Sequence, residues 1–279
     1  MNKLLELEQF LRELGPVAVA VSGGVDSMTL AVVANRVNSN SQLYHAVSPA
    51  VPLAATERVK HYANHEKWCL HIVDAKEIDD KNYRANPVNR CYFCKSNLYS
   101  TLAIDSSLTI VSGTNTDDLS DFRPGLQAAA EHNVMHPFVE VGIDKQTIRA
   151  IAKHLQLSDL QDLPAAPCLS SRVTTGIAID EKLLPVIDQV ETQVWQTYGK
   201  VLALTHVRCR ILPNQITIQL QGDVDFTNNA ESFAAMTQDA NQIFVQAGFD
   251  QAQFNNISVE PYRQGSAFIK DDIEVVNFV

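Results

Sequence analysis

A six-residue segment, Ser22-Gly23-Gly24-Val25-Asp26-Ser27, has the residue types of a phosphate-binding turn. Two glycines let a backbone turn tightly and approach a ligand closely. A serine hydroxyl near a helix start adds a donor to the unpaired N–H groups there, which attract anions. A carboxylate beside that anion is useful mainly where Mg²⁺ lies between the two. The segment lacks the Gly-Lys-Ser/Thr of a Walker A loop, so taken alone it predicts either another kind of nucleotide loop or an ordinary glycine turn.

A second set of residues that could bind a metal or do redox chemistry consists of three cysteines. Cys91 and Cys94 form a C-x-x-C pair, and Cys168 lies in a distant segment. Two thiolates at this spacing can bind one metal centre, and a third would leave one corner of a [4Fe–4S] cluster open for an exogenous sulfide. A redox dithiol and a zinc site are the alternatives. We expect an irregular backbone around the pair, unlike the helix start of a thioredoxin-type dithiol, and a structural zinc ribbon would need a second C-x-x-C.

Two arginines alternate along a predicted strand in the second half of the chain. Arg208 and Arg210 share one face of it, because side chains alternate between faces with period two. Neighbouring like charges repel unless an anion meets them, so the pair predicts either an anion site or a solvated surface pair. Cys69 and Cys209 lie in apolar strands, and we expect both to be core residues.

The elements around the glycine turn predict an α/β fold. Apolar runs that predict strands cover 17–21, 42–47, 69–73, 108–112 and 134–138. Amphipathic segments that predict helices cover 26–36, 56–68, 96–105 and 144–155. Strands that alternate with helices of this length are typical of a parallel sheet covered on both faces. The turn therefore lies between the first strand and its helix, where a parallel sheet places ligand sites.

The pattern changes in the second half of the chain. A segment at 161–178, rich in proline, serine and threonine, predicts a functional linker that carries Cys168. The following pattern predicts helices at 181–198 and 231–247 and strands at 206–212, 215–221 and 256–260. This order predicts a small α+β domain. We therefore expect a first domain at 1–160, the linker, and a second domain at 179–279.

Composition excludes several classes of protein. The 279 residues include 22 Lys+Arg and 32 Asp+Glu, a formal charge of −10, which argues against a non-specific nucleic-acid binder. No apolar run approaches the ~18 residues of a membrane helix. The first 14 residues predict an amphipathic helix and not a signal peptide. Five cysteines are too few for a disulfide scaffold, so we expect a cytoplasmic protein.

With a strand before it and a helix after it, the segment 22–27 resembles the PP-loop of ATP pyrophosphatases, which cleave ATP to AMP and pyrophosphate. The segment Gly113–Asp118 resembles a second motif of these enzymes, whose last acid helps hold Mg²⁺–pyrophosphate. Three further motifs are similar to the LarE family of ATP-dependent sulfur transferases: RCYFCK at 90–95, DFRPG at 121–125 and PCLSSR at 167–172. The resemblance extends from about residue 15 to about residue 265.

This resemblance implies a fold and a reaction. The fold would be the PP-loop, adenine nucleotide alpha hydrolase-like sheet with a small C-terminal α+β domain. The enzyme would adenylate a carboxylate of pyridinium-3,5-biscarboxylic acid mononucleotide, release pyrophosphate and form a thiocarboxylate for a nickel-pincer nucleotide cofactor. Members without the C-x-x-C sacrifice the sulfur of the linker cysteine. Members with all three cysteines are cluster-dependent and act over many turnovers, and this sequence resembles the second kind.

The resemblance also implies roles for individual residues. Catalytic roles fall on Cys168, Asp26 and Arg172. ATP and Mg²⁺ would be bound by Ser22, Gly23, Gly24, Val25, Asp26, Ser27, Gly113 and Asp118. The substrate would be bound by Arg123, Lys95, Ser170, Ser171, Arg208, Arg210, Glu191 and Arg263. A [4Fe–4S] cluster would be bound by Cys91, Cys94 and Cys168.

Partners follow from the same resemblance. They would be a sulfide source, a nickel-insertion protein acting downstream, and copies of this chain in a trimer or hexamer, with no membrane or nucleic acid. The alternatives are two related enzyme functions and a non-enzymatic iron–sulfur or adenine-nucleotide sensor. A cluster-dependent tRNA thiolase would need a broad basic surface, which the net charge disfavours. A PP-loop amidating synthetase would need an ammonia source, and the sequence has no N-terminal cysteine nucleophile for a glutaminase.

Overall fold

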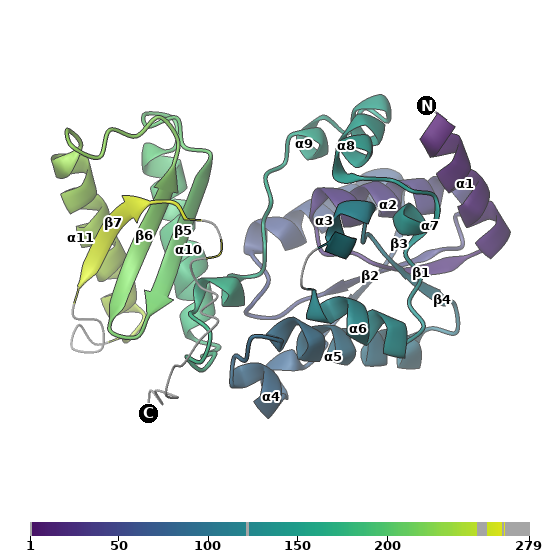
Figure 1. Ribbon diagram of the computed structural model, residues 1–279, viewed down its shortest axis with the longest axis horizontal. Helices are drawn as coiled ribbons and strands as arrows, with labels where there is room; N and C mark the ends of the chain where they lie inside the picture. The colour runs from purple at the N-terminus through teal and green to yellow at the C-terminus, as the bar shows by residue number, and fades with distance from the viewer. Residues whose placement is uncertain (1, 121–122, 250–255, 264, 266–279) are drawn as a thin grey trace. The chain divides into compact units, whose positions relative to one another are not determined.

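The computed structural model describes residues 2–120, 123–249, 256–263 and 265, and they form two compact units (Figure 1). The first unit comprises Met1–Tyr83 and Asn89–Ala166, and the second comprises Arg84–Val88 and Pro167–Val279. The short segment Arg84–Val88 therefore belongs to the second unit, although its neighbours on both sides in the sequence belong to the first.

The first unit is built on a parallel sheet with the strand order β3-β2-β1-β4. These strands are β1 (Val17–Ala20), β2 (Gln42–Ala46), β3 (Cys69–Val73) and β4 (Thr109–Ser112). In the register, Val19 lies opposite Leu43 on one side and opposite Val111 on the other. All four residues of β1 are buried, as expected for a central strand covered on both faces.

Helices cover both faces of this sheet (Figure 1). The larger apolar cluster contains Val17 and Val19 together with residues of α1 (Asn2–Leu14), α2 (Val25–Val37), α3 (Leu53–Glu66) and α8 (Lys145–His154). The second cluster contains Ala18 and Ala20 together with residues of α5 (Arg90–Asp105) and α6 (Pro124–Glu131). Because consecutive strand residues point to opposite faces, the two clusters lie on opposite faces of the sheet. The predicted α/β fold, with a PP-loop-like parallel sheet, is confirmed.

Several short helices complete the first unit. They are η1 (Glu77–Asp79), α4 (Lys81–Arg84, of which the last residue belongs to the second unit), η2 (Thr116–Ser120), α7 (Pro137–Glu140) and α9 (Ser158–Gln161). The start of α8 is as predicted, because the Asp144 side chain caps it by accepting a 2.7 Å bond from the Thr147 N–H.

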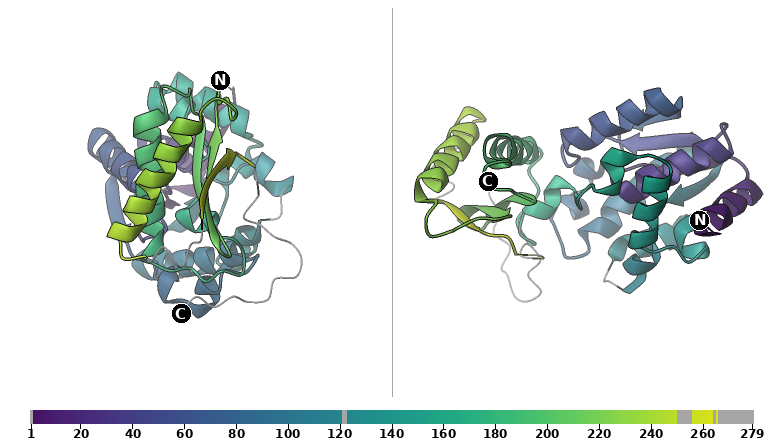
Figure 2. Two further views of the ribbon diagram at one scale, coloured as in Figure 1. Left: turned by 90° about the vertical axis from the view of Figure 1, so that its left-hand side faces the viewer. Right: turned by 90° about the horizontal axis from the view of Figure 1, so that it is seen from above.

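The second unit is an antiparallel hairpin with a third strand beside it. The predicted strands 206–212 and 215–221 are confirmed as β5 (His206–Leu212) and β6 (Gln215–Gln221), and β7 (Ile257–Pro261) pairs in parallel with β6. Two helices, α10 (Leu183–Tyr198) and α11 (Ala230–Gln246), cover one face of this small sheet (Figure 2). A short helix, η3 (Leu169–Arg172), precedes them.

Three local predictions are wrong. The predicted strand 134–138 is only a single bridge between Met135 and Val111, because Pro137 lacks the N–H needed to continue the ladder and instead begins α7. The helix predicted at 96–105 already begins at Arg90, so the C-x-x-C pair lies in its first two turns and not in irregular backbone. Cys69 is exposed because β3 is an edge strand, whereas Cys209 is buried as predicted.

Within the described ranges, no helix is both long and apolar enough to cross a membrane.

Candidate functional site

The segment 22–27 is a turn between β1 and α2 that is held together by Ser27. The Ser27 hydroxyl accepts a 3.1 Å bond from the Ser22 N–H and donates a 3.1 Å bond to the Gly24 carbonyl. Gly24 is the N-cap of α2 and provides no side-chain cap, and Met28 N makes the bond to the Gly24 carbonyl. The N–H groups of the first turn of α2 thus have no helical acceptor and are suited to an anion.

Two glycines of this region are required by close contacts. Gly23 has a φ of +84°, and a Cβ there would lie 2.9 Å from the Ala55 carbonyl oxygen. Gly113 follows β4, and a Cβ there would lie 2.7 Å from the Ser27 backbone nitrogen. The second predicted motif, 113–118, therefore packs directly against the start of α2, and a side chain at position 113 would fill the space beside the anion-binding amides.

Two carboxylates lie beside the turn. Asp26 Oδ2 is 2.5 Å from the Lys145 ammonium, while its Oδ1 is buried and has no hydrogen-bond partner among the described residues. Burial raises the pKa of Asp26, Lys145 opposes this rise, and the negative charge of Asp118 adds to it. Asp118 pairs through Oδ1 with Arg123 at 2.7 Å. Two neighbouring carboxylates, one with an unused buried oxygen, form a donor set that fits Mg²⁺ together with ligand phosphates.

Three side chains that support the turn were not found from the sequence. Arg58 donates a 2.9 Å bond to the Gly23 carbonyl, and Lys145 pairs with Asp26. His45 lies below the turn, with Nδ1 donating to the Val21 carbonyl at 2.8 Å and Nε2 accepting from a hydroxyl on α3 at 2.9 Å. These residues are distant in sequence from the turn, and only the position of Lys145 directly after a helix cap could have drawn notice.

Acid is expected to destabilise the first unit through His45. Burial lowers the pKa of His45 below its usual 6.5. Below that pH the unfolded chain takes up a proton that the folded chain does not, so the unfolding free energy falls as the pH is lowered from about 7 to about 5. His45→Asn keeps a donor to the Val21 carbonyl but cannot titrate, and it should show a smaller fall. Urea unfolding across this pH range measures the difference.

The control for this experiment is His154→Asn, because His154 is exposed at the end of α8. His154→Asn should keep the wild-type pH dependence. A residual dependence in His45→Asn is expected, since burial also lowers the pKa of His136. If His45→Asn and the wild type lost stability equally on acidification, the expectation would be wrong.

The C-x-x-C pair lies at the start of α5. Cys91 is exposed and Cys94 is partly buried, and their three-residue spacing places them on one face of the helix. A helix start is the geometry of a redox dithiol, so the backbone gives no ground for rejecting that alternative. Lys95 extends over the Tyr99 ring, with the ammonium 5.8 Å from the ring centre.

The predicted site residues divide between the two units. The first unit contains the turn, Gly113, Asp118, Arg123, Lys95, Cys91 and Cys94. The second contains Cys168, Ser170, Ser171, Arg172, Glu191, Arg208, Arg210 and Arg263. Among the described residues there is no group of three or more His, Cys, Asp or Glu side chains arranged to hold a metal ion. The convergence of the three thiols therefore stays a prediction, and the motif 121–125 is described only from Arg123 onward.

In the second unit, Arg172 is a clamp on the backbone around Cys168. Its Nε and one terminal nitrogen donate to the two carboxylate oxygens of Glu191, at 2.9 and 2.8 Å. Its other terminal nitrogen donates to the carbonyls of Pro167, at 2.5 Å, and Cys168, at 3.1 Å. Burial opposes the charge of Arg172, but Glu191 outweighs burial and the pKa of Arg172 is raised. Ser171 adds a 2.7 Å bond to the Cys168 carbonyl.

The same carboxylate faces two more arginines. Glu191 accepts a 2.8 Å bond from the Cys209 N–H and lies 3.9 Å from Arg208. Arg210, only 7% exposed, donates to the Ser171 carbonyl at 2.7 Å. The alternative of a solvated surface pair at positions 208 and 210 is therefore wrong. Three guanidinium groups outnumber the two carboxylates, Glu191 and Asp188, that act on Arg172, and the remaining positive charge suits an anionic substrate. Arg263 follows β7 and is exposed.

Replacing the Arg172 clamp by lysine is expected to lower the unfolding free energy by about 2–3 kcal/mol, because lysine keeps the charge but loses the paired bonds to Glu191. Arg36→Lys is the matched control. Arg36 also binds a carboxylate through two nitrogens, at 2.9 and 2.6 Å, but its side chain is 42% exposed, so the loss should be below about 0.5 kcal/mol. Urea unfolding measures the unfolding free energy of both variants. Equal losses in the two would contradict the stabilising role of the Arg172 clamp.

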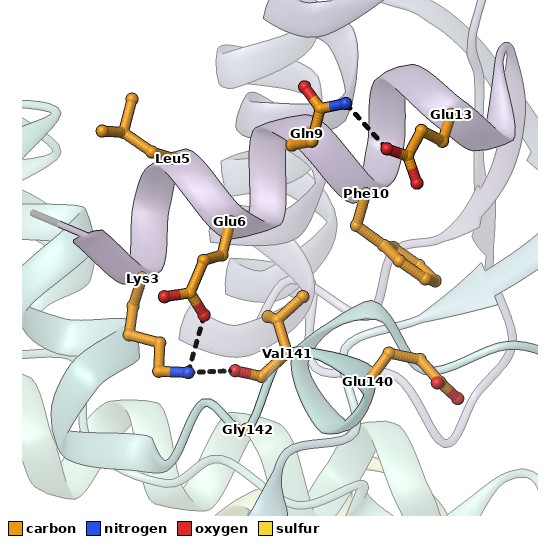
Figure 3. Close-up of a pocket in the computed structure, with 9 residues that line it drawn as sticks. All are labelled: Lys3, Leu5, Glu6, Gln9, Phe10, Glu13, Glu140, Val141 and Gly142. Atoms are coloured by element: carbon orange, nitrogen blue, oxygen red, sulfur yellow. Dashed lines mark hydrogen bonds and ion pairs between the residues drawn. The ribbon is translucent and has the colours of Figure 1, made fainter.

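A separate cavity lies in the first unit, between α1 and the turn that follows α7 (Figure 3). It is lined by Lys3, Leu5, Glu6, Gln9, Phe10, Glu13, Glu140, Val141 and Gly142. In it the Lys3 ammonium bridges Glu6, at 2.7 Å, and the Val141 carbonyl, at 2.6 Å. None of the predicted site residues lines this cavity.

Comparison with known proteins identifies relatives of the chain. No protein-family model matches it. It is 38% identical to the uncharacterized protein slr1717 of Synechocystis sp. over 225 residues, which cover 78% of this chain and 81% of that protein. It is 27% identical to the uncharacterized protein MJ0830 of Methanocaldococcus jannaschii over 231 residues, 80% of this chain and 86% of the relative.

A third relative has a named activity. The chain is 26% identical to the pyridinium-3,5-bisthiocarboxylic acid mononucleotide synthase of Lactiplantibacillus plantarum over 184 residues, 64% of this chain and 66% of the synthase. This similarity is that of a distant homologue. The chain belongs to the family of the slr1717 protein and is a distant homologue of the synthase.

Proposed function

We propose that the protein is an ATP-dependent sulfur transferase that acts on pyridinium-3,5-biscarboxylic acid mononucleotide. It would activate a carboxylate of this substrate as an adenylate and convert it to a thiocarboxylate, as a step in making a nickel-pincer nucleotide. The observation that carries the proposal is the anion-binding start of α2 beside Asp26, whose buried Oδ1 has no partner among the described residues. The distant homology to the synthase supports the choice of substrate.

The first step uses the turn of the first unit. A substrate carboxylate oxygen attacks the α-phosphorus of ATP, the bond from that phosphorus to the bridging oxygen breaks, and pyrophosphate leaves. The N–H groups at the start of α2 bind the pyrophosphate, and Ser27 and Arg58 hold the turn in shape. Asp26 and Asp118 would hold Mg²⁺, which when bound neutralises the negative charge that develops on the leaving group.

The second step uses the cysteines and the arginines. Cys91, Cys94 and Cys168 are thiol donors of the kind that hold a [4Fe–4S] cluster, which when bound supplies sulfide in a deprotonated, nucleophilic form. The Arg172 clamp fixes the backbone of Cys168, and Arg208 and Arg210 would bind the phosphate of the substrate. In this step sulfur bonds to the acyl carbon and AMP leaves.

Anaerobic purification of the full chain tests this proposal, with iron and sulfide counts and mass spectrometry of the product. The wild type should hold about four iron atoms and form the thiocarboxylate with Cys168 intact, whereas Cys91→Ala should lose the iron. Cys69→Ala is the matched control and should keep it, because Cys69 is exposed on β3 and lies outside the motifs.

Three results would overturn parts of the proposal. Zinc at about one per chain would overturn the cluster. A mass loss of about one H₂S at Cys168 after turnover would show sacrificial sulfur transfer instead. Thiolation of tRNA in place of the pyridinium nucleotide would favour the tRNA thiolase.

A further inference from the structure

The small sheet of the second unit has one apolar face and one polar face. The apolar face carries Val207, Cys209 and Ile211 of β5, which are all buried. The polar face carries the alternate residues of β5 and their partners on β6 and β7, namely His206, Arg208, Arg210, Thr217, Gln219, Gln221, Ser258 and Glu260. Because α10 and α11 cover one face, and apolar side chains pack against such helices, the polar side chains point away from the helices (Figure 2).

Two aromatic rings lie against each other at one end of the polar face. The rings of His206 and Tyr262 are stacked, with their centroids 5.5 Å apart and their planes 17° from parallel. Tyr262 follows β7, and its backbone N–H donates a 2.9 Å bond to the Leu220 carbonyl, which continues the pairing of β7 with β6. Both His206 and Tyr262 are partly exposed, so the pair presents aromatic surface to a ligand.

Charges of both signs lie beside the stacked rings. The Tyr262 phenol acts electrostatically on both Arg208 and Arg210 of β5. Glu260 lies on the same face of β7, two residues before Tyr262. Burial and the nearby Arg208 lower the pKa of His206, so this ring is neutral at pH 7 and does not repel a cation. The rings therefore lie between positive groups on β5 and a carboxylate on β7.

We propose that the His206–Tyr262 pair is a platform on which the pyridinium ring of the substrate stacks while Arg208 binds its phosphate. This inference rests on the proposed function, whose steps assign no residue to the ring. A pyridinium ring is flat and positively charged, and cations bind to the face of a tyrosine ring. The carboxylate of Glu260 favours the same positive ring, whereas Arg208 complements the negative phosphate. The polar face thus fits a ligand that carries both charges.

Calorimetric binding to the full-length protein tests this platform. The probes are nicotinic acid mononucleotide, which has the pyridinium ring, uridine monophosphate, whose ring is neutral, and ribose 5-phosphate, which has no ring. Tyr262→Leu should weaken binding of nicotinic acid mononucleotide by about 3- to 30-fold and of the other two probes by less than about 2-fold. Arg208→Gln should weaken all three, because all three have the phosphate.

Two further variants are the controls. Tyr262→Phe keeps an aromatic face and should bind the three probes as the wild type does, within about 2-fold. Tyr198→Leu replaces a partly exposed tyrosine at the end of α10 and should also leave binding unchanged. The melting temperatures of the variants show whether each one is folded, so that a loss of binding can be separated from a loss of structure.

A spectroscopic measurement reports the contact between the rings directly. Tyr262→Trp places an indole on the platform, and a pyridinium ring stacked on it quenches its fluorescence. Nicotinic acid mononucleotide should therefore quench the fluorescence that this variant adds to that of Trp68 and Trp195, which the wild type measures. Ribose 5-phosphate should not quench it.

The outcomes distinguish the platform from the proposed reaction. If Tyr262→Leu weakened nicotinic acid mononucleotide no more than ribose 5-phosphate, or if Tyr262→Trp showed no quenching, the stacked pair would serve only the fold of the second unit. The proposed reaction would then still stand. Wild-type protein that bound the mononucleotide through Tyr262 but made no thiocarboxylate would overturn the proposed reaction and leave the platform standing.

Discussion

Gly113→Ala is expected to weaken ATP binding by about 30- to 100-fold, a loss of about 2–3 kcal/mol. The added Cβ would lie 2.7 Å from the Ser27 nitrogen and 2.9 Å from the Asp26 carbonyl carbon. Both neighbours are backbone atoms, so no side chain can rotate to relieve the contact. The start of α2 must shift instead, and with it the N–H groups that bind the anion. Titration calorimetry with Mg²⁺–ATP measures the loss.

Gly24→Ala is the matched control, because it lies in the same turn with room for a side chain. Its φ is −82°, and the nearest atom to an added Cβ is the Ser22 hydroxyl oxygen at 3.7 Å, an ordinary contact. We expect Gly24→Ala to keep the wild-type melting temperature and Gly113→Ala to lower it. Wild-type ATP affinity in Gly113→Ala would show that the close approach of the two segments is not needed for binding.

Asn86→Asp is expected to have the largest effect on stability, more than about 4 kcal/mol in the second unit. Asn86 is fully buried, and its amide nitrogen donates to the carbonyls of Val173, Thr174 and Ile177 at 3.4, 2.8 and 2.8 Å. Its own carbonyl accepts from the Gly176 N–H at 3.0 Å. An aspartate would place an acceptor-only carboxylate against three carbonyl oxygens. Asn86→Ala, which only removes the donor, should cost about 3 kcal/mol.

Asn133→Ala is the control for the backbone contribution. Asn133 has a φ of +54°, almost the same as the +53° of Asn86, but its side chain is exposed. It reports the cost of placing alanine in a left-handed conformation, about 1 kcal/mol. Hydrogen exchange of the amides at 173–177, followed by mass spectrometry, measures the stability of the second unit separately from that of the first. Equal effects of Asn86→Ala and Asn133→Ala would show that the buried amide adds nothing.

Asn86 also joins two segments of the second unit that are distant in the sequence. It lies five residues before Cys91, and its partner Val173 lies five residues after Cys168. The chain returns to the first unit at Asn89, immediately before the C-x-x-C pair. Asn86 thus anchors the segment that precedes the C-x-x-C pair in the sequence to the segment that follows Cys168, both within the second unit.

The predictions that are confirmed rest on local signals. The turn at 22–27, the helix cap at Asp144 and the hairpin of β5 and β6 each follow from residue types within a short segment. The predictions that are wrong depend on the order of strands in the sheet or on a single residue. Cys69 is exposed because β3 is the edge strand of the sheet, and the hydrophobic periodicity of a sequence does not reveal strand order. Pro137 begins a helix and so interrupts the apolar segment that predicts a fifth strand.

The supporting residues of the site could not be predicted for a similar reason. Arg58, Asn86 and Lys145 act on partners 35, 87 and 119 residues away in the sequence. Apart from the helix cap directly before Lys145, nothing in the neighbouring residues distinguishes them from ordinary surface or turn residues. Their roles depend on which elements the fold brings together, and they become visible only once the sheet and its helices are in place.

The proposed reaction can be tested by ³¹P NMR of the products that the protein forms from Mg²⁺–ATP with and without pyridinium-3,5-biscarboxylic acid mononucleotide. We expect pyrophosphate only when the dicarboxylate is present, because its oxygen must attack the α-phosphorus, and we expect the AMP moiety as the acyl-adenylate until sulfur displaces it as free AMP. Formation of ADP and phosphate, or cleavage that ignores the dicarboxylate, would contradict the proposed reaction.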